Sequence, residues 1–266
     1  MSITWSAYKR ARRRSRQAWA ILGLAGVTVV TGLSWYFITG QFSTAEPWAA
    51  GPSEAPVYNS AWMKPLRGAS PVAPEKAIDA LERLAVQGRA AKSDYDRAAF
   101  GQAWADVDRN GCDTRNDILR RDLAAVEFTE GSSCKVGGGS FQEPYTGAWV
   151  TFRRGQDTSS AVQIDHVVAL ADAWQKGAQQ LTVQQRQVFA NDPLNLIAAD
   201  GPANGKKGAG DAATWLPGNK NFRCHYVARQ ISVKAAYQLW ITQAEKDAMK
   251  RVLSSCPEQQ TIYSDR

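Results

Sequence analysis

The stretch "IDHVVAL", residues 164–170, sets Asp165 and His166 side by side in a run of β-forming residues. His166 is one of only two histidines in a chain of 266 residues. A lone histidine on a strand is most often a core residue with satisfied hydrogen bonds. An adjacent carboxylate and imidazole also suit a metal-dependent catalytic centre. The sequence around this stretch has to decide between the two hypotheses.

The residues on either side of this stretch predict strands. "GAWVTFRRG" (147–155) and "AVQIDHVVAL" (161–170) are both rich in β-formers, and we expect them to pair as a hairpin across "QDTSS". Side chains on a strand alternate between its two faces. Asp165 and His166 therefore point to opposite faces unless the strand bulges or ends there.

Two asparagines follow the predicted strands. Asn195 lies in "DPLNLIAAD", and Asn204 lies in "PANGKKG", at the expected start of a short helix. Apolar residues at helical spacing predict further helices at 74–88, in the first part of 95–128, and at 114–123, 170–181, 182–192, 225–240 and 242–256. These elements together predict an α+β fold with a small antiparallel sheet and surrounding helices.

A strand, a loop and a helix that carry Asp-His, Asn and Asn in this order resemble the ββα-metal motif of the HNH endonucleases. Longer blocks over about residues 75–256 resemble the secreted bacterial HNH-family proteins related to the C-terminal domain of GmrSD-type restriction enzymes. These blocks are "YDRAAFGQAWADVDRNGCDTRNDILRRDL", "IDHVVALADAWQKGA", "FANDPLNLIAADGPANGKKGAGDAATWLP" and "YVARQISVKAAYQLW". The resemblance implies a ββα-metal (HNH) nuclease core and a metal-dependent endonuclease that hydrolyses phosphodiester bonds of DNA, with RNA left open.

The resemblance also implies roles for four residues. His166 would be the general base, because neutral imidazole accepts a proton from water near pH 7. Asp165 and Asn204 would bind the metal through oxygen atoms, and Asn195 would brace the loop beside His166. Mg²⁺ is the expected metal, with Mn²⁺ as an alternative, since hard cations keep several waters and need only one or two protein oxygens.

Basic residues near the motif are candidates for binding the nucleic-acid backbone. By the resemblance, Lys207 would lie near the phosphate, with Lys206 beside it. Arg153 and Arg154 on the preceding strand are further candidates, although adjacent arginines on a hairpin more often face solvent. No recognisable sequence-reading module accompanies the core, which favours low sequence specificity. The alternative function is a catalytically inactive cell-surface binding module on the same fold.

The acidic segment "DVDRNGCDTRND" (106–117) resembles the start of an EF-hand calcium loop. Its matching residues are Asp106, Asp108, Asn110 and Gly111. Asp117 occupies the twelfth position, where the pattern calls for a bidentate Glu. Cys112 occupies the place of a backbone ligand, so the competing hypothesis is a loop shaped by a disulfide rather than by Ca²⁺.

The four cysteines are predicted to form two disulfides, because all of them follow the apolar N-terminal run and their number is even. They are Cys112, Cys134, Cys224 and Cys256. Three pairings are compatible with the sequence. Closure of the shorter loops favours Cys112–Cys134 and Cys224–Cys256.

The N-terminal region differs in composition from the rest. Residues 1–17 contain six Lys and Arg and no acidic residue, and residues 18–38 carry no charge. An uncharged run of this length spans a bilayer as a helix, and the basic tail stays in the cytoplasm, which predicts a signal anchor with the C-terminal part outside. A secretory signal peptide cleaved near Ala45 is the alternative. A Pro- and Ala-rich linker (39–74) then leads to the predicted domain (75–266).

The net charge of +7 arises mostly from this tail. Without its six basic residues, the chain has 26 basic against 25 acidic side chains. The predicted exported part is therefore nearly neutral, and overall charge gives no argument for nucleic-acid binding. Any argument for DNA binding has to rest on local charge, such as the six basic residues between 204 and 234, which stand against only Asp211; an ordinary solvated face is an equally good interpretation of this charge.

Overall fold

The computed structural model describes residues 74–262. The predicted cytoplasmic tail, the predicted anchor at 18–38 and nearly all of the predicted linker lie outside these residues. Among the helices of residues 74–262, none is long and apolar enough to cross a bilayer.

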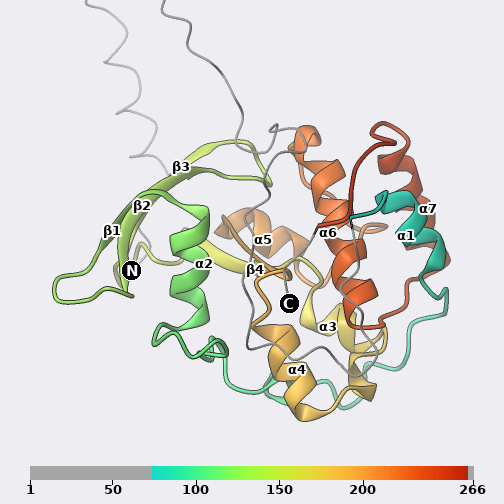
Figure 1. The fold of residues 1–266 in the computed structure, drawn as a ribbon, viewed down its shortest axis with the longest axis horizontal. Helices are drawn as coiled ribbons and strands as arrows, with labels where there is room; N and C mark the ends of the chain where they lie inside the picture. The colour runs from blue at the N-terminus through green and yellow to red at the C-terminus, as the bar shows by residue number, and fades with distance from the viewer. Residues whose placement is uncertain (1–73, 263–266) are drawn as a thin grey trace, which may run out of the picture. The chain divides into compact units, whose positions relative to one another are not determined.

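The chain alternates helical and extended segments (Figure 1). The α-helices are α1 (Ala77–Arg83), α2 (Thr114–Asp122), α3 (Leu170–Trp174), α4 (Val183–Ala190), α5 (Gly201–Lys207), α6 (Arg223–Ala236) and α7 (Gln243–Leu253). The short 3-10 helices are η2 (Arg97–Phe100), η3 (Ala178–Gln180) and η4 (Lys220–Phe222). The strands are β1 (Ala124–Phe128), β2 (Val136–Gln142), β3 (Trp149–Arg153), β4 (Val162–His166) and β5 (Leu196–Asp200). The predicted α+β class is confirmed.

The strands form two separate antiparallel sheets, β1-β2-β3 and β4-β5. The predicted hairpin between 147–155 and 161–170 is therefore wrong, because β3 pairs with β2 and β4 pairs with β5. Burial explains the choice of partner. Four of the five residues of β4 and four of β5 are buried, whereas three of five in β3 are exposed. Pairing with β5 lets β4 enter the core on both faces.

Strand β2 lies in a segment that sequence patterns do not identify as a strand. It contains Gly137, Gly138 and Gly139, which have low β-propensity. A Cβ atom at Gly139 would lie 3.1 Å from both the Ala124 carbonyl oxygen and the Leu123 Cβ. Glycine is therefore needed here because the backbone at the start of β1 approaches too closely for a side chain.

Most of the predicted helices are present, but the segment that begins at Tyr95 forms only the single turn of η2. Gly101 ends that turn with a φ of 77°. Trp104 also has a left-handed φ, of 58°. A right-handed helix cannot pass through residues in this conformation, so the chain continues as an irregular loop toward α2.

Helices cover the small sheets and form the core with them. Helix α2 packs against β2, β4 and β5, and α5 packs against β4 and β5. Helices α1, α6 and α7 contact one another and form a second layer. Within this layer, α1 and α7 pack against the long, mostly buried α6 (Figure 1). The two-stranded sheet thus lies between helices, and the ends of its strands are held in fixed positions.

Two disulfides close loops in the described region. They join Cys112 to Cys134 and Cys224 to Cys256. The predicted pairing by shorter loops is confirmed. The first bridge ties the loop before α2 to the start of β2, and the second ties α6 to the end of α7.

Candidate active site

Strands β4 and β5 and helix α5 bring three predicted site residues to one cavity. Strand β4 ends at His166, which pairs with Leu196 at the start of β5. Helix α5 follows β5 directly, and the Asp200 carboxylate caps it by accepting a hydrogen bond from the Ala203 amide. Asp165, His166 and Asn204 all line a cavity of about 300 Å³.

Asp165 is a buried carboxylate with one cationic and one neutral hydrogen-bond partner. The Lys207 ammonium lies 3.0 Å from Oδ1 and 2.9 Å from Oδ2 of Asp165, and it also donates to the His166 carbonyl at 2.8 Å. The Tyr145 hydroxyl donates to Oδ2 at 2.5 Å. Burial raises the pKa of Tyr145 well above its usual value, so its hydroxyl stays protonated and remains a donor. Lys207 is 3% exposed, and its ammonium holds the Asp165 carboxylate in place.

His166 is a buried imidazole whose protonation is fixed by its surroundings. Its Nε2 lies 2.8 Å from the Ala190 carbonyl oxygen. A carbonyl only accepts hydrogen bonds, so Nε2 carries the proton and Nδ1 keeps its lone pair. Burial, aided by the positive charges of Arg97 and Lys207, lowers the pKa of His166 to about 3. The side chain is therefore neutral at physiological pH and able to accept a proton.

Asn195 connects the end of β4 to the start of β5. Its Oδ1 accepts from the Val168 amide at 2.8 Å, and its Nδ2 donates to the Val168 carbonyl at 3.3 Å. Its own carbonyl accepts from the Val167 amide at 2.8 Å. Asn195 is fully buried and does not line the cavity. These bonds fix the backbone directly after His166.

Asn204 faces the cavity from α5. Its Nδ2 donates to the Gln163 side chain at 2.8 Å, which orients the amide group. Within residues 74–262 no hydrogen bond uses its Oδ1 atom, so this oxygen is free to bind a ligand. Asp165 and Asn204 together offer one carboxylate and one amide oxygen, a donor set that fits Mg²⁺. The Lys207 ammonium on the same carboxylate weakens the attraction for a cation.

The other predicted substrate-binding residues do not line this cavity. Lys206 is exposed on α5, next to the buried Lys207. Arg153 is exposed on β3. Arg154 is committed to internal contacts, because its guanidinium donates to the Val136 carbonyl at 2.5 Å and to the Asn116 side chain at 2.6 Å. The structure thus brings the asparagines and Asp-His together but leaves the arginines on the other sheet.

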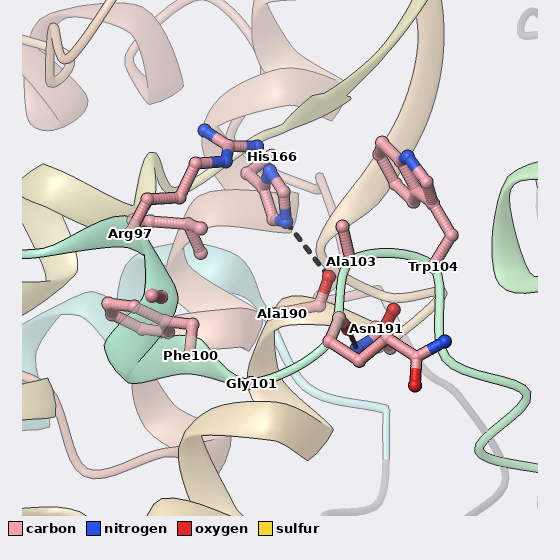
Figure 2. Close-up of a pocket in the computed structure, with 11 residues that line it drawn as sticks. Arg97, Phe100, Gly101, Ala103, Trp104, His166, Ala190 and Asn191 are labelled. Atoms are coloured by element: carbon pink, nitrogen blue, oxygen red, sulfur yellow. Dashed lines mark hydrogen bonds between the residues drawn. The ribbon is translucent and has the colours of Figure 1, made fainter.

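A second cavity, of about 240 Å³, opens on the same histidine. Its wall includes Arg97, Phe100, Trp104 and His166, and Figure 2 shows Arg97 and Trp104 on either side of the imidazole. The Trp104 ring lies nearly parallel to His166, with planes 18° apart and centroids 6.2 Å apart. The sequence analysis did not identify Arg97, Phe100 or Trp104 as site residues, because their segment was predicted to be a helix and instead forms one turn and an irregular loop.

Comparisons with known proteins identify the family of the chain. Residues 113–252, more than half of the chain, match the family described as "GmrSD restriction endonucleases, C-terminal domain". The chain belongs to this GmrSD C-terminal domain family. An uncharacterized secreted protein of Arthroderma benhamiae is 38% identical over 178 residues, which cover 66% of this chain and 82% of that protein. No solved structure matches the chain. The family resemblance expected from the sequence is confirmed.

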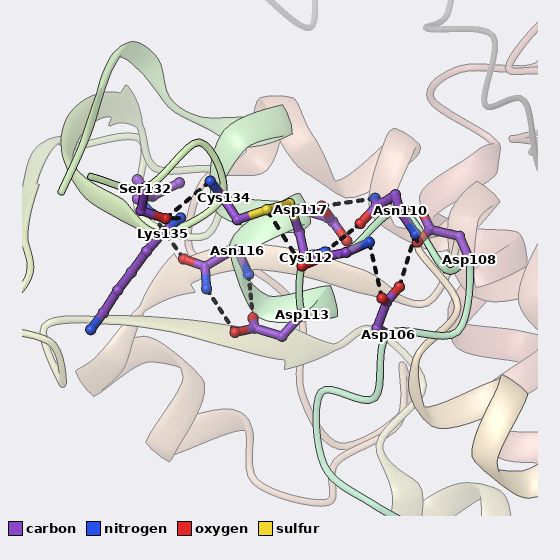
Figure 3. The surroundings of a disulfide bond; sticks show 12 residues. Asp106, Asp108, Asn110, Cys112, Asp113, Asn116, Asp117, Ser132, Cys134 and Lys135 are labelled. Atoms are coloured by element: carbon purple, nitrogen blue, oxygen red, sulfur yellow. Dashed lines mark hydrogen bonds between the residues drawn. A yellow bond between two sulfur atoms is a disulfide. The ribbon is translucent and has the colours of Figure 1, made fainter. Parts of the chain in front are cut away.

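The acidic loop of this GmrSD-family chain is held by its own hydrogen bonds (Figure 3). The Asp106 carboxylate accepts from the amides of Asn110 and Gly111, and the Asn110 side chain donates to Asp108 and Asp117. Burial, reinforced by the neighbouring carboxylates, raises the pKa of Asp117 to about 6. Within residues 74–262, no group of three or more His, Cys, Asp or Glu side chains is arranged to hold a metal ion.

A buried ionic network connects the elements that carry the site residues to helices α6 and α7. Lys176, between α3 and η3, lies 2.8 Å from Asp172, 2.8 Å from Asp211 and 2.6 Å from Glu245. Lys234 of α6 also pairs with Glu245. Asp172 belongs to the helix that follows β4, and Asp211 belongs to the turn that follows α5. The network therefore joins the elements that carry His166 and Asn204 to α6 and α7.

Proposed function

We propose that this chain is an exported, divalent-metal-dependent endonuclease that hydrolyses phosphodiester bonds of DNA with low sequence specificity. One observation carries the proposal. A buried carboxylate, a neutral imidazole and an amide oxygen converge on one cavity at the end of β4, next to the start of α5. Two antiparallel strands followed by a helix, with the residues in this order, correspond to a ββα-metal nuclease core.

His166 is the proposed general base. Its Nε2–H is occupied by the Ala190 carbonyl, so Nδ1 takes the proton from the attacking water. The low pKa means that His166 needs no deprotonation before the reaction. Contact with an anionic phosphate would raise this pKa and strengthen the base, because a nearby negative charge favours imidazolium.

Asn195 and Lys207 are proposed to position the reacting groups. Asn195 fixes the backbone at Val167 and Val168, which sets the direction of the imidazole. Lys207 binds both the Asp165 carboxylate and the His166 carbonyl, so it fixes the spacing between these two residues. In this placement Lys207 acts on the phosphate through Asp165 rather than by direct contact.

Asp165 and Asn204 are the proposed ligands of the metal. A divalent cation held there, Mg²⁺ or Mn²⁺, would supply charge stabilisation for the phosphate and the leaving oxygen. The pairing of Asp165 with Lys207 predicts weak binding, so that millimolar rather than micromolar metal would be needed. The acidic loop at 106–117 keeps no role in this proposal, because its hydrogen bonds and disulfide account for its shape.

Export of the domain is supported by two observations. Both pairs of cysteines are joined as disulfides, which persist in oxidising compartments. The relative from Arthroderma benhamiae is named a secreted protein. Anchoring through residues 18–38, with the N-terminus in the cytoplasm, stays a prediction, as does the alternative of cleavage near Ala45.

Digestion of supercoiled plasmid and of RNA by the purified chain tests the proposed activity. Cleavage of plasmid should appear with Mg²⁺ or Mn²⁺ and disappear with EDTA. Nicked and linear products with staggered ends across many sites would fit low specificity. If a folded protein leaves both polymers intact at millimolar metal, the chain is an inactive binding module on the nuclease fold.

A further inference from the structure

The second cavity lies beside the proposed active site and shares part of its wall. His166, Arg97 and Leu170 line both cavities. The imidazole and its neighbours therefore separate a polar cavity, which holds Asp165 and Asn204, from a mostly apolar one. A polymer whose phosphate occupied the first cavity would place an adjacent nucleoside close to the second.

The apolar cavity has the size and chemistry of a site for a small aromatic group. Its volume of about 240 Å³ falls just below the range of roughly 300–1,000 Å³ that drug-sized ligands occupy. Phe100 and Trp104 supply aromatic surface, and the exposed Arg97 guanidinium supplies positive charge at the boundary. Within residues 74–262 that guanidinium takes part in no ion pair, so it is free to meet a phosphate.

The backbone of Trp104 is held in an unusual conformation. Its φ of 58° is rare for a bulky aromatic residue. The Trp104 carbonyl accepts from the Thr114 amide at 3.4 Å, and the Thr114 hydroxyl donates to the Ala105 carbonyl at 2.5 Å. The start of α2 thus holds the loop so that a half-buried indole lies in the cavity wall. Strained conformations of this kind gather at ligand-binding sites.

We infer that this cavity binds an unpaired nucleobase next to the cleaved phosphodiester, with the base stacked on Trp104 and the flanking phosphate near Arg97. This inference rests on the proposed nuclease function and deepens it. Stacking on an aromatic face is tolerant of base identity, which agrees with low specificity. In a duplex both faces of each base are covered by its neighbours, so the cavity favours single-stranded or locally opened nucleic acid.

Binding in EDTA tests the inference without cleavage. Fluorescence anisotropy of the full-length chain compares a short oligothymidylate with an abasic phosphodiester chain of equal length and charge, and with the matching duplex. The parent should bind the oligothymidylate about 5- to 150-fold more tightly than the abasic chain, the range expected for one stacked base. Trp104→Ala should abolish this preference and leave binding to the abasic chain unchanged.

Two variants separate stacking from structural damage. Trp104→Phe keeps an aromatic face and should retain part of the preference, whereas Trp104→Leu keeps apolar bulk and should lose it. Trp149→Ala removes an exposed ring from β3, away from both cavities, and should behave like the parent. The inference is overturned if the Trp104 variants keep the preference, if they lose affinity for both single chains equally, or if the parent binds the duplex as tightly as the single strand.

Cleavage with Mg²⁺ is measured separately, so that the two claims fail independently. A parent that prefers the oligothymidylate through Trp104 but never cleaves would refute the nuclease function and leave the base site standing. A parent that cleaves but shows no preference dependent on Trp104 would refute the base site alone. A parent that binds neither single chain would refute the base site, and the cleavage assay alone would then decide the nuclease function.

Discussion

Replacing Lys176 by methionine removes the central cation of the buried network and should destabilise the fold severely. Methionine preserves most of the length of the aliphatic stem but leaves the carboxylates of Asp172, Asp211 and Glu245 without their shared partner. The Lys176 side chain is fully buried, and the three carboxylates are at most 2% exposed. Water therefore cannot replace the lost ammonium.

The expected magnitude follows from this burial. Removing one partner from a buried ionic cluster costs about 3–5 kcal/mol when a charge is left uncompensated. Arg89 and Lys234 still pair with these carboxylates, but three buried negative charges then face only two positive ones. The loss would be a large share of the roughly 5–15 kcal/mol by which domains are stable. For a domain of this size each kcal/mol shifts the melting temperature by about 2–4 °C, so the variant should melt about 6–20 °C below the parent.

The acid dependence of stability should change as well. Burial alone would raise the pKa of Asp211, but the hydrogen bond and charge of Lys176, together with Arg89, hold it at about 2. The folded pKa lies below the ordinary value of 3.8, so this carboxylate contributes stability above about pH 4 and loses it as the pH falls toward 2. In Lys176→Met the pKa of Asp211 rises toward its unfolded value, so the difference between the two states shrinks and the loss of stability between about pH 4 and 2 should become smaller.

Urea and thermal unfolding at pH 7 measure the effect, with Lys250→Met as the matched control. Lys250 pairs with Glu82 at 2.6 Å, but these side chains are 44% and 48% exposed. Exposed pairs contribute about 0–1 kcal/mol, so the control should melt within a few degrees of the parent. If Lys176→Met is as stable as Lys250→Met, the network does not hold the helices together, and the structural reasoning is wrong.

Three further predictions follow from the site and its supports. Replacing Cys112 and Cys134 together by serine should cost about 2–4 kcal/mol in urea unfolding, and mass spectrometry of the folded parent should detect no free thiol. Asp165→Ala and Asn204→Ala should lower the cleavage rate and recover part of it at higher Mg²⁺ or Mn²⁺, since mass action offsets weaker binding; a loss that metal never restores would exclude them as ligands. Stability should fall as the pH drops from 6.5 toward 3, because the unfolded imidazole of His166 takes up a proton that burial excludes from the folded state. Folded His166→Gln should show a weaker acid dependence over this range, and an unchanged dependence would assign the effect to other groups.

Sequence patterns predicted the helices well where an amphipathic segment packs along one side of the core. Helices α2, α6 and α7 lie close to their predicted ranges. The pairing of the cysteines also followed from chain length. In both cases the decisive interactions are local, so the order of residues carries enough information.

Pairing between distant strands was the part that sequence could not supply. Strand β4 pairs with β5, which begins 30 residues after β4 ends, and the glycine-rich β2 pairs with β3. These partners are chosen by burial and close approach in three dimensions, not by the propensity of either segment. The same limit applies to Lys207, whose place in a basic loop gave no sign that its ammonium is buried against Asp165.

Within the site, sequence identified the residues with distinctive chemistry and missed those that shape the cavity. Asp165, His166 and Asn204 share one cavity, as the motif required. Tyr145 and Trp104 reach the same region from unrelated segments, and their contacts depend on the path of loops. Their roles become visible only once the two sheets and α2 are in place.

The rate of metal-dependent cleavage by His166→Ala, compared with His225→Ala, tests the central claim most directly. His225 is the other histidine of the chain, lies on α6 and lines neither cavity. Folded His166→Ala should still bind metal but cleave DNA about 10²–10⁴-fold more slowly, the usual effect of losing one acid–base group, while His225→Ala should stay close to the parent. If His166→Ala remains folded and cleaves at the parent rate, His166 is only a core histidine and the proposed mechanism is contradicted.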